Sequence, residues 1–559
     1  MLRSFRAFFT YALLTVALTW PLAANLTIMD AGDSAFFAWE TAWELHALTT
    51  DPARLPHANI FHPLRFTLGM DEPVLGTTIL ALPLWPFTTD AVWLYNVLRL
   101  LTFALSGLTA YWLARELGCD EAPALFAGAA FAFSPIRTDQ IAHLSTLGTQ
   151  WLPALLLFMH RFARTGRVQD ALLASLFFVL EFLACGYHGV IGLAILPLGA
   201  LVLLSGRFRE RLPMAMLATA LAGLALLPLY LLHHEALAPE RYSRSNAETV
   251  FYSAALESFL ATSSWNRVWG EATAPFRTLG PNNLFPGLTV LLLPVAGTIV
   301  LWKRRARPSR DVLALLVIGL AAVIVACGPE VRAFGHALFP SPFGLLRQVL
   351  PIFQMIRVTS RAGVYLALPL AVLAAKGLGA LRLPPLPTAL VATLGLAETL
   401  IAPIPMPEWT KIIDSRREPP AVYRWLADQA GRPPVVHLPM LDVYGLERRP
   451  RYHESIYMVY STLHWNPLVN GYAGIEPAHY VRMRELARGF PSRELVDALR
   501  EVGVRYIVLH RGGYGPVQWP RIEGRLPDFK EELVPAASFG EDTVFELRAR
   551  PAAAGAAQN

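Results

Sequence analysis

Long apolar runs fill the first 405 residues of this 559-residue chain. Residues 406–559 instead carry dense Arg, Glu and Asp, with no apolar stretch near the ~20 residues that a helix needs to cross a bilayer. Charged residues make up 16% of the chain and hydrophobic residues 54%, whereas ordinary soluble domains are about 25% charged. The sequence therefore predicts an α-helical polytopic membrane protein with a water-facing C-terminal region.

About eleven apolar segments are candidate membrane spans. They are residues 7–26, 91–114, 121–135, 144–161, 170–187, 189–205, 212–232, 285–302, 312–327, 361–381 and 386–405. The count is good to about one, because several segments are shorter than the ~20 residues of an ideal span. The first segment has an apolar stretch of ~19 residues, which is long for a signal peptide, so it is interpreted as an uncleaved anchor.

Basic clusters in the short loops indicate sidedness, because Lys and Arg there favour the cytoplasm. The clusters lie at residues 3–6, 115, 161–167, 207–211, 303–310 and 382. With these spans, every cluster falls on the side of the N-terminus, which predicts a cytoplasmic N-terminus and an extracytoplasmic C-terminal region. The apolar residues 74–88 are interpreted as an interfacial helix, since a further span there would reverse every later cluster. The net charge of +6 belongs to these clusters, so no nucleic-acid partner is expected.

The predicted topology divides the chain into regions of different character. Residues 1–405 form the transmembrane region, and its long first outer loop spans residues 27–90. Residues 406–550 are expected to form a small extracytoplasmic α/β domain, since helical and strand patterns alternate there. The helices are predicted at 421–429 and 493–501, and the strands at 435–438, 505–510 and 543–547. The Ala-rich tail, residues 551–559, is expected to be disordered.

Acidic residues stand out in the first outer loop. Asp33 and Glu40 lie on a predicted helix that follows the membrane interface, and Asp71 and Glu72 come later in the same loop. Carboxylates beside apolar spans are partly desolvated, which raises their pKa and suits them to accept a proton from a substrate hydroxyl. The alternative for any one of them is a solvated acidic face or a helix cap.

Cationic and imidazole side chains mark two further outer segments. Arg137 and His143 lie in the short turn after the third span, and Arg357 and Arg361 are four residues apart at the start of the tenth. Ionisable groups at a membrane boundary are functional candidates, and paired guanidinium groups at a helix start suit a phosphate. The alternatives are helix capping in the turn and snorkelling of the arginines to lipid headgroups.

Aromatic residues crowd residues 453–480 of the C-terminal region, among them Tyr457, His464, Trp465 and Tyr472. Aromatic rings and amides suit carbohydrate, because rings stack on sugar faces while amides bond to hydroxyls. Packing of these rings against the membrane surface is the alternative.

Several stretches, in order along the chain, resemble bacterial membrane glycosyltransferases of the GT-C type. They are Gly-Asp-Ser at 32–34, Asn-Ile-Phe-His-Pro at 59–63, Phe-Ala-Phe-Ser-Pro at 131–135, Gln-Trp-Leu-Pro at 150–153, Leu-Phe-Pro-Gly-Leu at 284–288, Arg-Val-Thr-Ser-Arg at 357–361 and His-Trp-Asn-Pro-Leu-Val-Asn-Gly-Tyr at 464–472. Each is weak alone, but their joint order is specific. The resemblance implies a multi-pass protein of the bacterial plasma membrane.

The resemblance also implies a reaction. A polyprenyl-phosphate sugar would be the donor, and an acid of the first outer loop, Asp33 by position, would be the general base of an inverting transfer. The expected substrate-binding residues are Glu40, Asp71, Glu72, Arg137, His143, Arg357 and Arg361. Arg357 and Arg361 would meet the donor phosphate, while Asp71 and Glu72 would bind the acceptor or a divalent metal. The acceptor is an unspecified glycan, lipid or protein, and no other cofactor is expected.

One departure from the family pattern bears on the base. Many GT-C enzymes have adjacent acids early in the first loop, whereas here Asp30 and Asp33 are three apart and the adjacent pair, Asp71 and Glu72, comes late. That pair is therefore an alternative base. Two other functions also fit many spans with charged groups, namely a lipid or glycan transporter and an inactive assembly protein.

Overall fold

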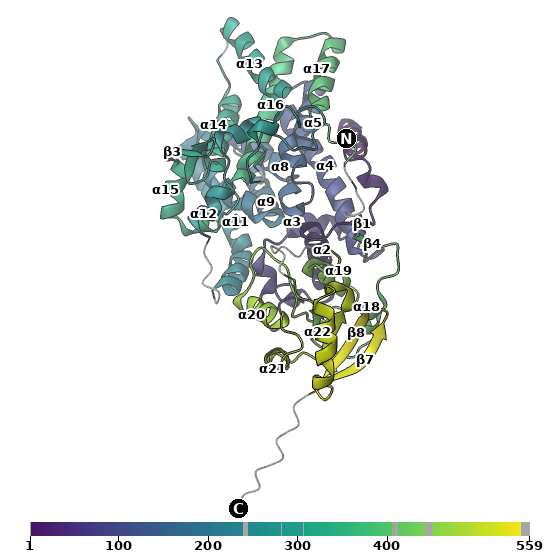
Figure 1. Ribbon diagram of the computed structural model, residues 1–559. Coiled ribbons are helices and arrows are strands. Elements are labelled where there is room, and N and C mark those ends of the chain that lie inside the picture. The colour runs from purple at the N-terminus through teal and green to yellow at the C-terminus, as the bar shows by residue number, and fades with distance from the viewer. Residues whose placement is uncertain are drawn as a thin grey trace, which may run out of the picture.

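The computed structural model describes residues 2–238, 244–280, 282–305, 307–404, 406, 412–441 and 450–548. Long helices form one part of the molecule, and the C-terminal strands β7 and β8 lie below them with α18, α20, α21 and α22 in Figure 1. The predicted tail at 551–559 lies outside the described residues.

Each predicted apolar segment overlaps a helix. The helices are α1 (Leu2–Leu18), α4 (Ala91–Glu116), α5 (Glu121–Ala132), α8 (Leu152–Thr165), α9 (Val168–Ala184), α10 (Gly186–Leu204), α11 (Phe208–Leu237), α13 (Leu288–Lys303), α14 (Arg310–Ala326), α16 (Gly363–Leu381) and α17 (Pro385–Ala397). Among the described helices, four are long and apolar enough to cross a membrane: Ala91–Glu116, Gly186–Leu204, Phe208–Leu237 and Thr359–Leu381. The number of crossings and their sidedness therefore remain predictions.

Small residues let these helices approach closely. A Cβ added at Gly297 of α13 would lie 2.6 Å from the Cα of Gly377 on α16, so the two backbones touch. Close packing of small residues is the main source of helix association in lipid. Residues 74–88 form the short α3 (Leu75–Thr78) and a 3₁₀ turn, Ile79–Ala81, rather than one long helix.

The first outer loop is built around α2 (Asp33–Thr50), which differs from the predicted interfacial helix. Its residues from Ala35 to Leu45 are buried, including Glu40 and Glu44, so its acidic side chains do not form a solvated face. The helix packs against α19 (Glu454–Ser461) of the C-terminal region. The spacing of apolar residues predicted α2 but not that α19 covers it.

The first loop and the C-terminal region share one core. The strand β1 (Ile28–Met29) pairs with β4 (Ile413–Asp414), and the backbone N–H of Phe61 donates to the Asn470 carbonyl. The side chain of Asn59 joins both parts, because it accepts from Trp39 and donates to Ser461. The loop is therefore folded onto the C-terminal region.

The C-terminal region holds a four-stranded mixed sheet in the order β5-β6-β8-β7. The strands are β5 (Val435–Leu438), β6 (Tyr506–His510), β7 (Leu533–Phe539) and β8 (Asp542–Leu547). Strands β5 and β6 run parallel, and the other two pairings are antiparallel. The helices around the sheet are α18 (Ala421–Ala427), α19, α20 (Ala478–Ala487), α21 (Arg493–Glu501) and α22 (Gln518–Arg525).

Shorter elements complete the outer side. They are α6 (Pro135–Thr138), α7 (Leu144–Leu147), α12 (Asn246–Phe251), the hairpin of β2 (Glu330–Ala333) and β3 (His336–Pro340), and α15 (Pro342–Val349). Several of the predicted site residues lie on or beside these elements.

Candidate active site

A cavity of about 380 Å³ lies where the outer segments meet. Its lining includes Asp33 at the start of α2, His143 before α7, Arg357 and Arg361 before α16, and Tyr472 before α20. These residues are far apart in the sequence. The fold thus brings five predicted site residues, the first four of these and Arg137, to one cavity, together with Tyr472 from the aromatic stretch.

Asp33 is held by two side chains. His143 Nε2 lies 2.8 Å from Asp33 Oδ2, and the Tyr472 hydroxyl donates to Oδ1 over 2.7 Å. Burial alone would raise the pKa of Asp33, but the interactions with His143, Tyr472 and Arg361 outweigh it and hold that pKa well below its ordinary value. Asp33 is therefore an ionised carboxylate at neutral pH, facing the cavity.

The backbone before Asp33 explains its position. Gly32 precedes the helix with φ of 80°, a left-handed value that favours glycine. Its N–H donates to the Ser455 hydroxyl of α19 over 2.9 Å. This contact fixes the start of α2, and with it the Asp33 carboxylate, against the C-terminal region.

Arg361 is anchored by Glu72. Its Nη1 lies 2.7 Å from Glu72 Oε1, with both side chains largely buried at 12% and 11% exposure. The guanidinium lies 4.2 Å above the Tyr187 ring, and Glu72 also accepts from the Ser145 hydroxyl and the Tyr187 N–H. Because Glu72 orients Arg361 toward the cavity, its role here is positioning.

Arg357 contributes a second cation to the same wall. Its Nη1 lies 3.5 Å from Glu248 Oε1, and its guanidinium lies 5.0 Å from the Tyr252 ring centre. Arg244 also contacts Glu248 Oε1, over 3.1 Å. One carboxylate therefore lies between two guanidinium groups, only one of which, that of Arg357, lines the cavity.

Asp71 fastens a loop rather than lining the cavity. Its Oδ2 accepts from the Gly474 N–H over 2.6 Å and its Oδ1 from the Glu72 N–H over 2.8 Å. Burial, and then the charge of Glu72, raise the pKa of Asp71 to about 6. The contact with Gly474 holds the loop that carries Tyr472, so Asp71 positions a residue of the cavity without lining the cavity itself.

Glu40 does not reach the cavity. It is fully buried in α2, and neither of its carboxyl oxygens has a hydrogen-bond partner among the described residues. Burial raises its pKa well above the ordinary value, and burial also raises the pKa of Glu44 to about 8. The geometry thus makes Glu40 a neutral core acid, which does not favour the predicted contact with substrate.

Arg137 touches the cavity wall, but its guanidinium is engaged locally. It is 2% exposed, donates to the Ala132 and Leu147 carbonyls, and lies between the rings of Phe103 and Phe131. An arginine bound in this way holds the turn that carries His143. Its geometry favours support of the site over direct contact with a ligand.

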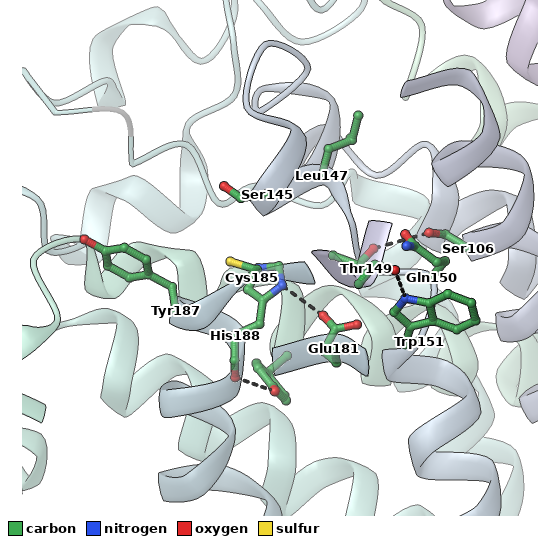
Figure 2. Close-up of polar contacts among 12 residues, drawn as sticks. Ser106, Ser145, Leu147, Thr149, Gln150, Trp151, Glu181, Cys185, Tyr187 and His188 are labelled. Atoms are coloured by element: carbon green, nitrogen blue, oxygen red, sulfur yellow. Dashed lines mark hydrogen bonds and ion pairs between the residues drawn. The ribbon is translucent and has the colours of Figure 1, made fainter. Parts of the chain in front are cut away.

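A buried polar network lies among the helices behind Glu72. Figure 2 shows His188 of α10 joined to Glu181 of α9, over 2.9 Å, with Gln150 and Trp151 close by. The Cys185 thiol lies 3.5 Å from Glu72 Oε2 and connects this network to the ion pair with Arg361. Glu181 is therefore paired, as is Glu398, which accepts from the N–H and hydroxyl of Thr289.

A divalent metal finds no matching donor set in the described parts of the chain. Among these residues, no three His, Cys, Asp or Glu side chains are grouped to hold a metal ion. Asp71 accepts from two backbone N–H groups, and Glu72 faces the guanidinium of Arg361.

Tyr472 and Asn283 are among the cavity residues that the predicted site does not include. Tyr472 was noted only as one of the aromatic residues and as the end of the stretch at 464–472, yet it contacts Asp33 directly. Asn283, which donates to Asp139 over 3.0 Å, precedes the Leu-Phe-Pro-Gly-Leu stretch and carried no signal of its own.

A protein-family model matches residues 77–397, more than half of the chain. The chain belongs to the DUF6311 family, a domain of unknown function. A search of functionally curated proteins finds no match.

Two solved structures have a fold similar to that of this chain. The arabinofuranosyltransferase AftD from Mycobacteria aligns with a TM-score of 0.54 and 18% identity, over 98% of this chain and 41% of that one. The Archaeoglobus fulgidus oligosaccharyltransferase in its apo form aligns with a TM-score of 0.50 and 14% identity, over 90% of this chain and 69% of that one. This DUF6311 chain thus spans less than half the length of the mycobacterial protein.

These alignments confirm the predicted GT-C-like helical architecture, whereas the count of about eleven spans stays a prediction. The chain has the GT-C type of architecture and is a membrane protein. At such low identity the likeness concerns the fold, so the chemistry has to be argued from the cavity.

Proposed function

We propose that this chain is a membrane glycosyltransferase that moves a sugar from a polyprenyl-phosphate donor to an acceptor hydroxyl on the extracytoplasmic face. The observation that carries the proposal is the cavity in which the Asp33 carboxylate and the Arg357 and Arg361 guanidinium groups share one wall. A base and a phosphate-binding pair are the two functions that such a transfer needs. The GT-C fold agrees with it.

The cavity can hold the reacting groups. Its volume of about 380 Å³ is at the small end of the roughly 300–1,000 Å³ found for ligand sites. Sugar and phosphate would occupy it while the polyprenyl chain remains in lipid. The lining suits both, because Tyr472, Asn283 and Gln140 offer polar groups to hydroxyls and the arginines offer donors to phosphate.

The reaction is a single displacement. The acceptor oxygen forms a bond to the anomeric carbon, its proton passes to Asp33, and the bond from that carbon to the phosphate oxygen breaks. Arg361 and Arg357 hold the leaving polyprenyl phosphate, whose negative charge grows as it departs. Attack from the face opposite the phosphate inverts the anomeric centre.

The lowered pKa of Asp33 is compatible with proton transfer late in the displacement. A carboxylate with a lowered pKa accepts a proton only when the hydroxyl becomes acidic, as it does when its oxygen bonds to the sugar. The bound donor phosphate offsets part of the positive field of Arg361, which is one of the influences that lower the pKa of Asp33. Binding of the donor therefore makes Asp33 a better base.

The test uses the purified full chain in proteoliposomes with a radiolabelled polyprenyl-phosphate sugar. Asp33→Asn should lower transfer by roughly 10²–10⁴, the usual contribution of a general base. Asp51→Asn is the matched control, because Asp51 is exposed and caps a turn at the other end of α2. Transfer that persists in Asp33→Asn contradicts the assignment of the base. If the lipid instead crosses the vesicle with its sugar bond intact, the proposal of an enzyme fails.

A further inference from the structure

A second hollow, of about 550 Å³, lies outside the catalytic cavity. It is bounded by β3 of the hairpin, by α15 and by the start of α12, and we call it the hairpin pocket. Its polar lining includes Arg244, Asn246, Arg347, Gln348 and Gln354. None of these residues lines the catalytic cavity.

The lining of the hairpin pocket carries the guanidinium groups of Arg347 and Arg244, whose Nη atoms are also hydrogen-bonded within the fold. Arg347 is 6% exposed, and its guanidinium is braced by Asn246 Oδ1 at 3.2 Å and the Arg244 carbonyl at 3.1 Å. The one carboxylate in its lining, Glu330, is bonded to Arg332. Guanidinium and amide donors around a hollow of this size suit a phosphate group.

The rim of the hairpin pocket is apolar and exposed. Leu338 is 52% exposed and Leu345 62%, and both line the hairpin pocket. The hairpin and α15 connect α14 to α16, both rich in apolar residues, so with the predicted spans this rim would lie at the membrane boundary. An apolar rim around a cationic hollow fits a ligand with a hydrocarbon chain and a phosphate head.

An ion cluster joins the hairpin pocket to the catalytic cavity. Arg244 lines the pocket, Arg357 lines the cavity, and both contact Glu248 Oε1, at 3.1 and 3.5 Å. One carboxylate therefore links an arginine of the hairpin pocket to an arginine of the catalytic cavity.

We propose that the hairpin pocket is a loading position that binds the phosphate head of the polyprenyl-phosphate carrier one step outside the catalytic cavity. The identity of the carrier rests on the proposed function, whereas the site itself rests on Arg244, Arg347 and the apolar rim. The chain then binds two carrier lipids at saturation, one on Arg347 and one on Arg361.

The test counts carrier lipids on the full chain. The protein is placed in phosphatidylcholine nanodiscs, polyprenyl monophosphate is titrated in, and native mass spectrometry gives the number of bound lipids. Gln348→Glu adds a negative charge to an exposed position in the hairpin pocket, so it should not disturb folding. Gln518→Glu, exposed on α22, is the matched control.

The wild type and the control should each bind two lipids. Gln348→Glu should weaken one of them at least tenfold, and Arg361→Gln should remove the other. Arg347→Gln should act like Gln348→Glu, with an unfolding midpoint measured alongside to verify the fold. A single bound lipid in the wild type, or two unchanged in Gln348→Glu, overturns the proposal.

Two further arms identify the ligand chemistry. Polyprenol without phosphate should fail to fill the hairpin pocket, and binding as tight as that of the phosphate would overturn the role of the arginines. An equal amount of phosphatidylglycerol should not displace the carrier, and displacement would assign the site to bulk anionic lipid instead. Because these readouts count lipids, they are independent of the Asp33 transfer assay, and either result can fail alone.

Discussion

The Tyr472 hydroxyl donates a 2.7 Å hydrogen bond to Asp33 Oδ1 across a sequence separation of 439 residues. Two residues later, the Gly474 N–H donates to Asp71. The loop before α20 thus contacts two acids of the first outer loop, Asp33 and Asp71. In this fold the C-terminal region supplies part of the candidate active site.

Tyr472→Phe should lower kcat by roughly 10–100-fold, because it removes the hydrogen bond that orients the Asp33 carboxylate in the cavity. The ring should stay in place, since it packs against Phe36 and His453. Kinetics with the labelled donor measure the effect. Tyr506→Phe, which removes a hydroxyl bonded to Gln429 in the sheet, is the control and should leave kcat unchanged. Equal rates for the two variants would separate Tyr472 from the chemistry.

Glu72→Ala should destabilise the protein by about 3–5 kcal/mol, because it leaves the buried Arg361 without its counter-ion. Glu72→Gln should cost less, since the amide can still accept hydrogen bonds. The exposed pair of Arg505 and Glu546 is the control, and Glu546→Gln should cost less than about 1 kcal/mol. Thermal unfolding in detergent gives the comparison, and a small loss in Glu72→Ala would mean that water reaches Arg361.

The pH profile should separate the two candidate bases. The pKa of Asp33 lies well below its ordinary value, so this base stays ionised from pH 8 to pH 5. Burial raises the pKa of Asp71 to about 6, so a reaction that used Asp71 as its base would lose about tenfold per pH unit below that value. We expect no acid limb near pH 6 from the base in kcat/KM. A limb there that disappears in Asp71→Asn would reverse the assignment.

Glu40→Gln should become more stabilising as pH rises. The folded pKa of Glu40 lies well above 4.5 because of burial, so between these two values the unfolded chain releases a proton that the folded chain keeps. Wild-type stability therefore falls as pH rises through this window, while the amide does not titrate. The unfolding midpoint of Glu40→Gln minus wild type should grow from pH 5 to pH 8. A constant difference would show that Glu40 is ionised in the fold.

Local residue patterns predicted helices and strands well where the pattern lies within a single element. The predicted strand at 435–438 matches β5 residue for residue, and the predicted strand at 505–510 contains β6. The gathering of Asp33, His143, Arg357 and Arg361 was also predictable, because each lies at a helix start or turn on the predicted outer side. The sidedness of these residues in a membrane stays a prediction.

Burial was not predictable from spacing. The acids of α2 recur at helical intervals, which is equally compatible with water or with a covering layer, and the layer comes from α19 more than 400 residues later. Arg137 illustrates the same limit, since its Nη atoms donate to the carbonyls of Ala132 in α5 and Leu147 in α7. Sequence spacing does not show which polar groups a fold uses internally.

The pairing of β1 with β4 has a practical consequence for engineering this family. Because residues 28–29 and 413–414 form one ribbon, and the Asp90 carboxylate that caps α4 also accepts from Ser415, the two segments form a single exchangeable module. A chimera that replaces only the first outer loop, or only the C-terminal region, would cut through this ribbon. Grafts between DUF6311 relatives should therefore transfer both segments together.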